Sequence, residues 1–116
     1  MGRTFLVATL LFAVAGCASL EGARLYRSGT EALERGDAER ATDRLSRAAH
    51  LLPQASEVQN HLGLAHLAAG RRAEARRAFE RAVLLDCDNA SARHNLAAVL
   101  AGPGASPDAP ATAAAP

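Results

Sequence analysis

Two stretches of this chain repeat one another at a spacing of 34 residues. Residues 56–89 align without a gap on residues 22–55, and small or large apolar residues recur at equivalent positions. The equivalent pairs include Gly29 and Gly63, Gly36 and Gly70, Leu45 and Phe79, and Ala48 and Ala82. Residues 90–101 begin a third, partial unit. A fixed period of this length indicates a stacked array of helical repeats.

Each complete unit carries two amphipathic helical patterns separated by a glycine. The spacing predicts helices over about residues 21–35, from Asp37 to about 52, from 56 to Gly70, over 71–85 and over 90–101. Asp37 and Asn89 are expected to cap the helices that follow them, and Ser56 with Gln59 has the spacing of a capping box. Arg71 and Arg72 stand where a cap is expected, so that turn is predicted to be looser.

The repeats resemble the tetratricopeptide repeat (TPR) family over about residues 22–101. The family pattern is matched by Gly29, Ala41, Leu45, Ala48 and Pro53 in the first unit, and by Gly63, Ala75, Phe79 and Ala82 in the second. Cys87 stands where proline is common. The resemblance implies an all-α fold, a short right-handed solenoid of two helical hairpins plus a C-terminal capping helix.

The same resemblance implies a concave surface that binds a peptide or helix of another protein. Carried over position by position, its partner-binding residues are Tyr26, Arg27, Thr30, Asn60, His61, Leu64, Leu67, His94 and Asn95. The other expected lining positions are Ala23, Leu33, Glu34, Glu57, Ala68, Ser91, Ala98 and Ala101. Arg27 is the only cation of this set, so the carboxylate clamp of some family members is not expected. An open alternative is that Asn60 and Asn95 only tie adjacent repeats together.

Residues 1–16 have the features of a targeting segment. Arg3 precedes an apolar run of 11 residues, Phe5 to Ala15, which is too short for a spanning helix of roughly 20 residues. The run ends in Val-Ala-Gly-Cys at residues 14–17, which resembles the lipobox of bacterial lipoproteins. The resemblance implies cleavage before Cys17 and covalent diacylglycerol and N-acyl chains on that cysteine. An ordinary cleaved signal with a chance cysteine is the alternative.

Residues 17–21 are then a short lipid-anchored tether. Ala18, rather than aspartate, follows the cysteine, which by resemblance favours the outer membrane and a position facing the periplasm. Residues 102–116 are rich in Pro, Ala and Gly and are predicted to be a disordered tail, either a spacer or a docking peptide.

Composition argues against a nucleic-acid partner, since the 13 basic and 12 acidic residues nearly balance and aromatic residues are scarce. No motif for catalysis or for a non-covalent cofactor is found, so no enzyme activity and no metal are expected. His66 is predicted to be a satisfied core histidine, and His50 to suit the end of its helix. The sequence therefore favours an envelope scaffold serving pilus, secretion or outer-membrane assembly. The alternative is a metal or small-ligand carrier using His61 and His94.

Two features suggest self-association. Leu96, Val99 and Leu100 give the last helix more apolar surface than a solvated cap needs, so the C-terminal end is expected to dimerise or to dock on a partner. Cys87 is either a free thiol able to form an intermolecular disulfide or a partly buried residue that replaces proline.

Overall fold

The computed structural model describes the backbone of residues 2–103 and the side chains of residues 16–103. These residues form five helices and no strand: α1 (Gly2–Glu34), α2 (Ala38–Leu51), α3 (Ser56–Ala68), α4 (Arg72–Leu85) and α5 (Ala90–Ala101). The all-α prediction is confirmed, and four of the five helices lie within two residues of their predicted bounds. The predicted disordered tail lies almost wholly outside the described residues.

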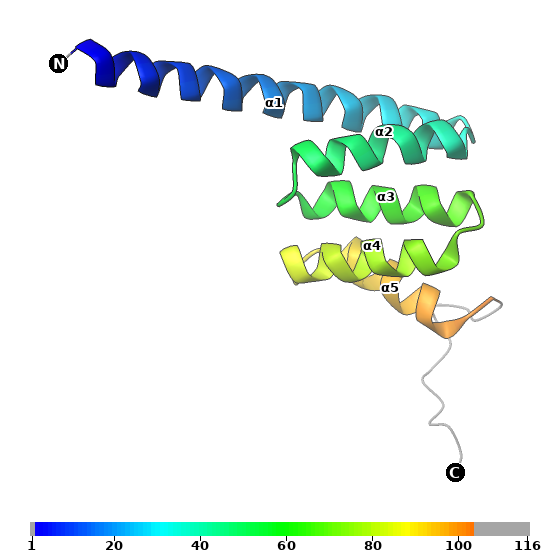
Figure 1. The fold of residues 1–116 in the computed structure, drawn as a ribbon. Coiled ribbons are helices and arrows are strands. Elements are labelled where there is room, and N and C mark those ends of the chain that lie inside the picture. Colours follow the sequence, from blue (N-terminus) through cyan, green and yellow to red (C-terminus); the bar gives the residue numbers. More distant parts are fainter. Residues whose placement is uncertain (1, 104–116) are drawn as a thin grey trace.

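The helices stack as antiparallel hairpins (Figure 1). α1 packs on α2, α3 packs on α4, and α3 also contacts α1, α2 and α5. The second repeat therefore supplies the central helix of the stack, with the first repeat on one side and α5 on the other. This arrangement is a short solenoid of helical hairpins, as predicted.

The core of each hairpin is one large side chain placed against a glycine. Leu45 and Phe79 are fully buried, at 0% exposure each. A Cβ atom added to Gly29 would lie 2.6 Å from Leu45 Cγ, and one added to Gly63 would lie 2.4 Å from Phe79 Cε1. The recurring pairs of the sequence are therefore packing contacts between the two helices of a hairpin.

The turns inside the two hairpins share one geometry. Gly36 and Gly70 have φ values of +78° and +75°, a region that residues with a side chain disfavour. The amide of the next residue reaches back to a helix carbonyl, from Asp37 to Ala32 and from Arg71 to His66. These are the hydrogen bonds of a helix C-terminus closed by a left-handed glycine, so the predicted helix stops are confirmed.

Helix capping follows the sequence at two of three predicted places. Asp37 accepts a hydrogen bond from the Arg40 amide, and Asn89 accepts one from the Ala92 amide. The capping box at Ser56 is wrong, because Ser56 is already the first residue of α3 and its hydroxyl donates to the Ala82 carbonyl instead. Asn89 Nδ2 then donates to Ser56 Oγ at 2.9 Å. Ser56 thus joins α3 to α4 and to the turn before α5.

The N-cap of α4 is Arg71, which makes no side-chain cap, as the sequence suggested. Both arginines of this turn nevertheless have partners. Arg71 donates to both carboxylate oxygens of Glu39 at 2.8 and 2.9 Å, and Arg72 donates to the Val99 carbonyl near the end of α5. The turn is therefore linked to the first repeat and to α5.

α1 begins far earlier than the predicted first helix at residue 21. The predicted helix start at about residue 21 is wrong, because residues 17–21 are helical and the sequence contains no proline before Pro53. α1 consequently extends past the packed hairpins (Figure 1). Within the described residues, no helix is both long enough and apolar enough to cross a membrane. The boundaries at residues 16, 21 and 101 stay predictions.

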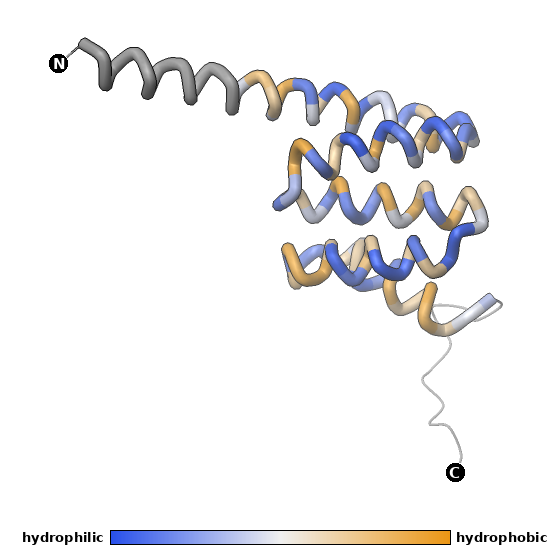
Figure 2. The backbone as a smooth tube through the Cα atoms, viewed as in Figure 1, coloured by the Kyte–Doolittle hydropathy of each residue, from blue (hydrophilic) through white to orange (hydrophobic). Residues whose placement is uncertain are grey.

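The C-terminal helix exposes less apolar surface than predicted. Val99 is 6% exposed, and Leu96 packs against the cluster formed by Val99 and Phe79. Only Leu100 of the three predicted residues remains exposed, at 59%. Figure 2 shows how closely hydrophobic and hydrophilic residues alternate along the packed helices. Leu100 is therefore the one exposed large apolar side chain that α5 offers for association.

Cys87 is exposed in the turn between α4 and α5. The prediction of a partly buried residue in place of proline is wrong, because this turn points its side chain outward and not toward the core. Cys17 is also exposed, on the outer part of α1. Both thiols are free in the structure.

Candidate partner-binding groove

An open hollow of about 510 Å³ lies between α3 and α5. The α3 helix contributes four side chains to it and α5 contributes another four. The lining residues are Glu57, Asn60, His61, Leu64, Ala90, Ser91, His94 and Asn95. We call this hollow the groove. It contains five of the nine predicted partner-binding residues, because positions four residues apart lie on one face of each helix.

The predicted residues of α1 reach the groove through one contact. The Tyr26 hydroxyl lies 3.2 Å from His61 Nδ1, and the two rings meet edge to face with centroids 5.3 Å apart. His61 Nδ1 also lies 3.0 Å from the Glu57 carbonyl and 3.3 Å from the Glu57 carboxylate. Tyr26 thereby fixes the imidazole at the border between the first and second repeats.

Burial, and secondly the Glu57 carboxylate, raise the pKa of the Tyr26 hydroxyl above its usual value. The phenol is therefore protonated at neutral pH. It can donate its proton to His61 or to a ligand, which gives this border of the groove a fixed hydrogen-bond donor.

Asn60 and Asn95 lie on the floor of the groove. Asn95 Nδ2 donates to Asn60 Oδ1 at 2.9 Å, and Asn60 is only 2% exposed. The alternative that these residues tie adjacent repeats together is the one that this geometry supports. Asn60 has little surface left for a partner, whereas Asn95 is half-buried and keeps part of its amide accessible.

The remaining predicted residues divide between groove and core. Leu64 lines the groove and also packs against the Phe79 cluster, whereas Leu67 packs against that cluster and does not line the groove. Thr30 donates its hydroxyl to the Arg27 carbonyl at 2.9 Å, so its side chain is used within α1. Arg27 is exposed and is not among the residues that line the groove.

Ala90 lines the groove, although the repeat pattern does not predict it. Ala90 is the first residue of α5, and the lining positions of the repeat begin only at the second residue of each unit. Its small side chain leaves the end of the groove open next to Ser91. The groove therefore presents hydrogen-bonding groups along its length and apolar side chains at Leu64 and at Ala90.

His66 lies outside the groove, and the prediction that it is a satisfied core histidine is wrong. It is half-buried, and its Nδ1 atom is buried without a hydrogen-bond partner among the described residues. Burial, and secondly the Arg71 guanidinium, lower the pKa of this imidazole. The Arg77 guanidinium lowers this pKa further and the Glu74 carboxylate raises it, and the net effect favours the neutral imidazole.

The described residues contain no group of three or more His, Cys, Asp and Glu side chains placed to hold a metal ion. His61 and His94 both line the groove, but the Nδ1 atom of His61 faces Glu57 and Tyr26. No observation in the described part of the chain therefore favours the carrier or sensor alternative.

Comparison with known families bears on the central hairpin. Residues 56–89 match the family model described as the tetratricopeptide repeat. This unit is similar to a TPR. The match has the same two boundaries as the second repeat found from the internal period, so the TPR part of the prediction is confirmed. Comparison with curated proteins finds no match. A TPR is typically a module that binds other proteins or peptides, so the match indicates a protein-interaction module.

Proposed function

We propose that this protein is a lipid-anchored TPR module of the bacterial envelope, whose groove binds a peptide segment of another envelope protein. The observation that carries the proposal is the open hollow between α3 and α5, lined by side chains of mixed chemistry. His94 and Ser91 are exposed there, and Glu57 lines the same hollow. These groups can donate to and accept from an extended backbone, while Leu64 offers an apolar contact.

The groove suits an internal segment of a partner better than a free C-terminus. A carboxylate is usually held by paired cationic donors. The lining has no arginine, and the Glu57 carboxylate, which lies 3.3 Å from His61 Nδ1, would repel a carboxylate. A segment with backbone amides and one or two small apolar side chains matches the groove better.

The anchor is the second part of the proposal. The apolar run before Cys17 and the exposure of that cysteine on α1 support it. Each acyl CH₂ buried in lipid contributes about 0.8 kcal/mol, so two or three chains would hold the protein firmly at a membrane. Ala18 favours the outer membrane, with the repeats in the periplasm. Assembly of a pilus, a secretion system or the outer membrane is the role that such a scaffold would serve.

Mass spectrometry of the protein isolated from membranes tests the anchor. We expect an intact mass that begins at Cys17 and carries diacylglycerol and an N-acyl chain, whereas Cys17→Ser should retain the leader and take up no labelled fatty acid. Cleavage at another bond with no added lipid would contradict the anchor and would leave the groove proposal standing.

Photo-crosslinking tests the groove. A photoreactive amino acid replaces His94, which is exposed in the groove, or Arg77, which is exposed on α4 outside it. We expect His94 to give a discrete adduct with an envelope protein, and a peptide from the crosslinked segment to suppress it. Equal adducts from both positions, or no competition by the peptide, would contradict a groove-specific partner.

A further inference from the structure

One end of the helical stack differs from the other in its surface chemistry. The turns at residues 52–55 and 86–89 meet at this end, and α1 leaves the stack beside them (Figure 1). We call it the α1-exit end. The opposite end holds the turns at residues 35–37 and 69–71 and the last residues of α5.

Exposed leucines gather at the α1-exit end. Among the described residues, the large apolar side chains that remain exposed are Leu20 at 55%, Leu51 at 37%, Leu84 at 80% and Leu100 at 59%. Leu51 and Leu84 are at or next to the last residues of α2 and α4, and Leu20 is two residues before Gly22, which packs on Leu51 and Leu52. Three of these four leucines therefore lie at one end, although single exposed leucines are otherwise ordinary and scattered.

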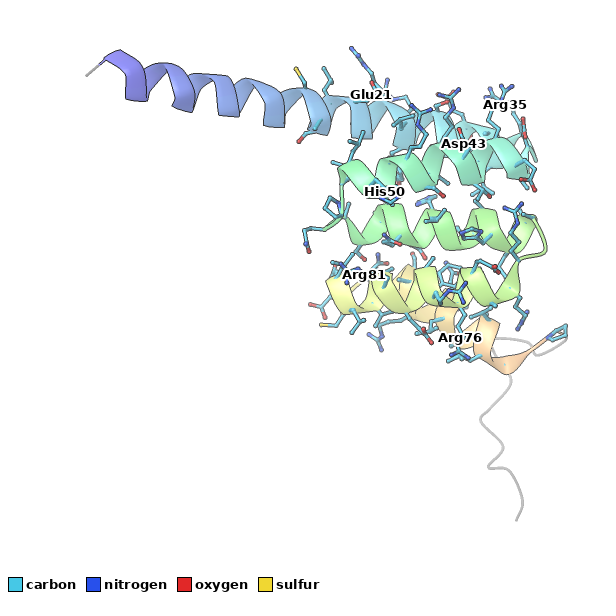
Figure 3. All side chains as sticks on the ribbon, in the orientation of Figure 1. Glu21, Arg35, Asp43, His50, Arg76 and Arg81 are labelled. Atoms are coloured by element: carbon cyan, nitrogen blue, oxygen red, sulfur yellow. The ribbon has the colours of Figure 1, made fainter. Side chains whose placement is uncertain are left out.

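The arginines are also distributed unevenly. Six of the described arginines make no ion pair with a described carboxylate. One of them, Arg72, lies at the opposite end and donates to the carbonyls of Ala98 and Val99. The other five lie in the half of the stack nearest the α1-exit end: Arg24, Arg27, Arg47, Arg81 and Arg93. In contrast, Arg35, Arg40 and Arg71 beside the opposite turns are each paired with a carboxylate. Figure 3 shows the labelled Arg81 toward the α1-exit end and Arg35 toward the other.

Carboxylates are present at the α1-exit end as well, on Glu21, Glu57, Asp86 and Asp88. Five arginines against four carboxylates leave little net charge, so attraction over a distance does not explain a partner here. Unpaired guanidinium groups instead suit short-range bidentate contacts with phosphate groups. Leucines flanked by such arginines are the combination found on surfaces that sit in a lipid interface.

The position of Cys17 indicates that a lipid surface lies against the α1-exit end. Gly22, which is buried and packs on Leu51 and Leu52, lies five residues after Cys17 in the same helix, which corresponds to about 7–8 Å along the axis. Acyl chains on Cys17 would therefore hold the α1-exit end against the headgroups. A helical link leaves less freedom to swing away than a flexible tether of the same length.

We propose that the α1-exit end rests on the phospholipid surface, with Leu20, Leu51 and Leu84 in the interface and the unpaired arginines on lipid phosphates. This inference rests on the proposed anchor at Cys17. The five helices then stand on the membrane, and the groove opens sideways along it. A partner segment would cross the groove at a fixed height above the lipid.

A single tryptophan can report this orientation, because the protein contains none. Leu84→Trp places the probe at the α1-exit end, and Leu100→Trp places a matched, exposed probe at the opposite end. The full-length precursors are expressed, isolated from membranes and reconstituted in phosphatidylcholine and phosphatidylglycerol vesicles. We expect brominated acyl chains to quench L84W at least about threefold more strongly than L100W, since interfacial groups lie within about 5–10 Å of the acyl boundary. Iodide should quench L100W more strongly.

Three other results of the quenching experiment would overturn the docking. Equal quenching of both probes by iodide in vesicle-bound protein would overturn the docking while leaving the anchor intact. A blue-shifted L84W that neither bromine nor iodide quenches would indicate burial against a second copy or another protein, which also overturns it. Failure of both variants to remain with the vesicles would overturn the docking together with the anchor. Matching helical circular dichroism spectra confirm that both variants are folded.

Discussion

Replacing Phe79 with alanine is expected to lower the free energy of unfolding by about 3–5 kcal/mol, as for other buried Phe to Ala changes. Phe79 is fully buried and packs with Ala75, Val99 and Leu96, so its loss would open a cavity where α3, α4 and α5 meet. A domain of this size has about 5–15 kcal/mol of stability in total. The variant should therefore be close to unfolding at physiological temperature.

Urea titration followed by circular dichroism measures this effect. We expect the midpoint to fall by on the order of 2 M, given a urea dependence of about 1–3 kcal/mol per molar. Leu84→Ala is the matched control on the same helix, since Leu84 is 80% exposed and should change stability by less than about 0.5 kcal/mol. Equal shifts for the two variants would show that the packing around Phe79 is not as described.

Replacing Gly63 with alanine is expected to destabilise the fold by about 1–3 kcal/mol, the usual range for an overpacked core. The new Cβ atom would lie 2.4, 2.6 and 2.8 Å from three atoms of the Phe79 ring. Alanine is intrinsically the better helix former by about 1 kcal/mol, so a net loss would come from this steric clash. The ring is rigid, and the helices would have to move apart.

A double-mutant cycle separates the clash from other effects of the substitution. Gly63→Ala is measured alone and in a Phe79→Leu background, where the narrower side chain leaves room for the added carbon. We expect the cost of the alanine to fall by about 0.5–3 kcal/mol in that background. An identical cost in both backgrounds would contradict the contact between these two residues.

The sequence predicts the scaffold well because small and large residues recur at fixed spacing. Gly29 with Leu45, and Gly63 with Phe79, are separated by the same number of residues and form the same packing contact in the structure. Gly36 and Gly70 adopt positive φ values that follow directly from residue chemistry. Asp37 and Asn89 cap helices because their short side chains reach the free amides of the first turn.

Predictions fail where a long-range contact competes with a local rule. Ser56 has the spacing of a capping box, yet its hydroxyl is used by Ala82 and Asn89 from later in the chain. His66 occupies a core position, but α4 provides no acceptor or donor for its Nδ1 atom. Neither outcome can be deduced from neighbouring residues, since both depend on how α3 and α4 are placed.

The groove was predicted less completely than the fold. The repeat pattern correctly places His61, Leu64, His94 and Asn95 on its lining. It does not distinguish lining from core at Leu67, and it does not show that Asn60 is almost fully buried beneath Asn95. Side-chain burial decides these cases, and it depends on the packing of α5 against the second repeat.

The groove between α3 and α5 is the proposed binding site for the partner. The most direct measurement is calorimetric titration of the crosslinked partner segment into wild type, His94→Ala and Arg77→Ala. We expect His94→Ala to weaken binding by about tenfold, corresponding to the loss of about 1.4 kcal/mol, and Arg77→Ala to leave it unchanged. Unchanged affinity in His94→Ala, or an equal loss in both variants, would contradict the claim.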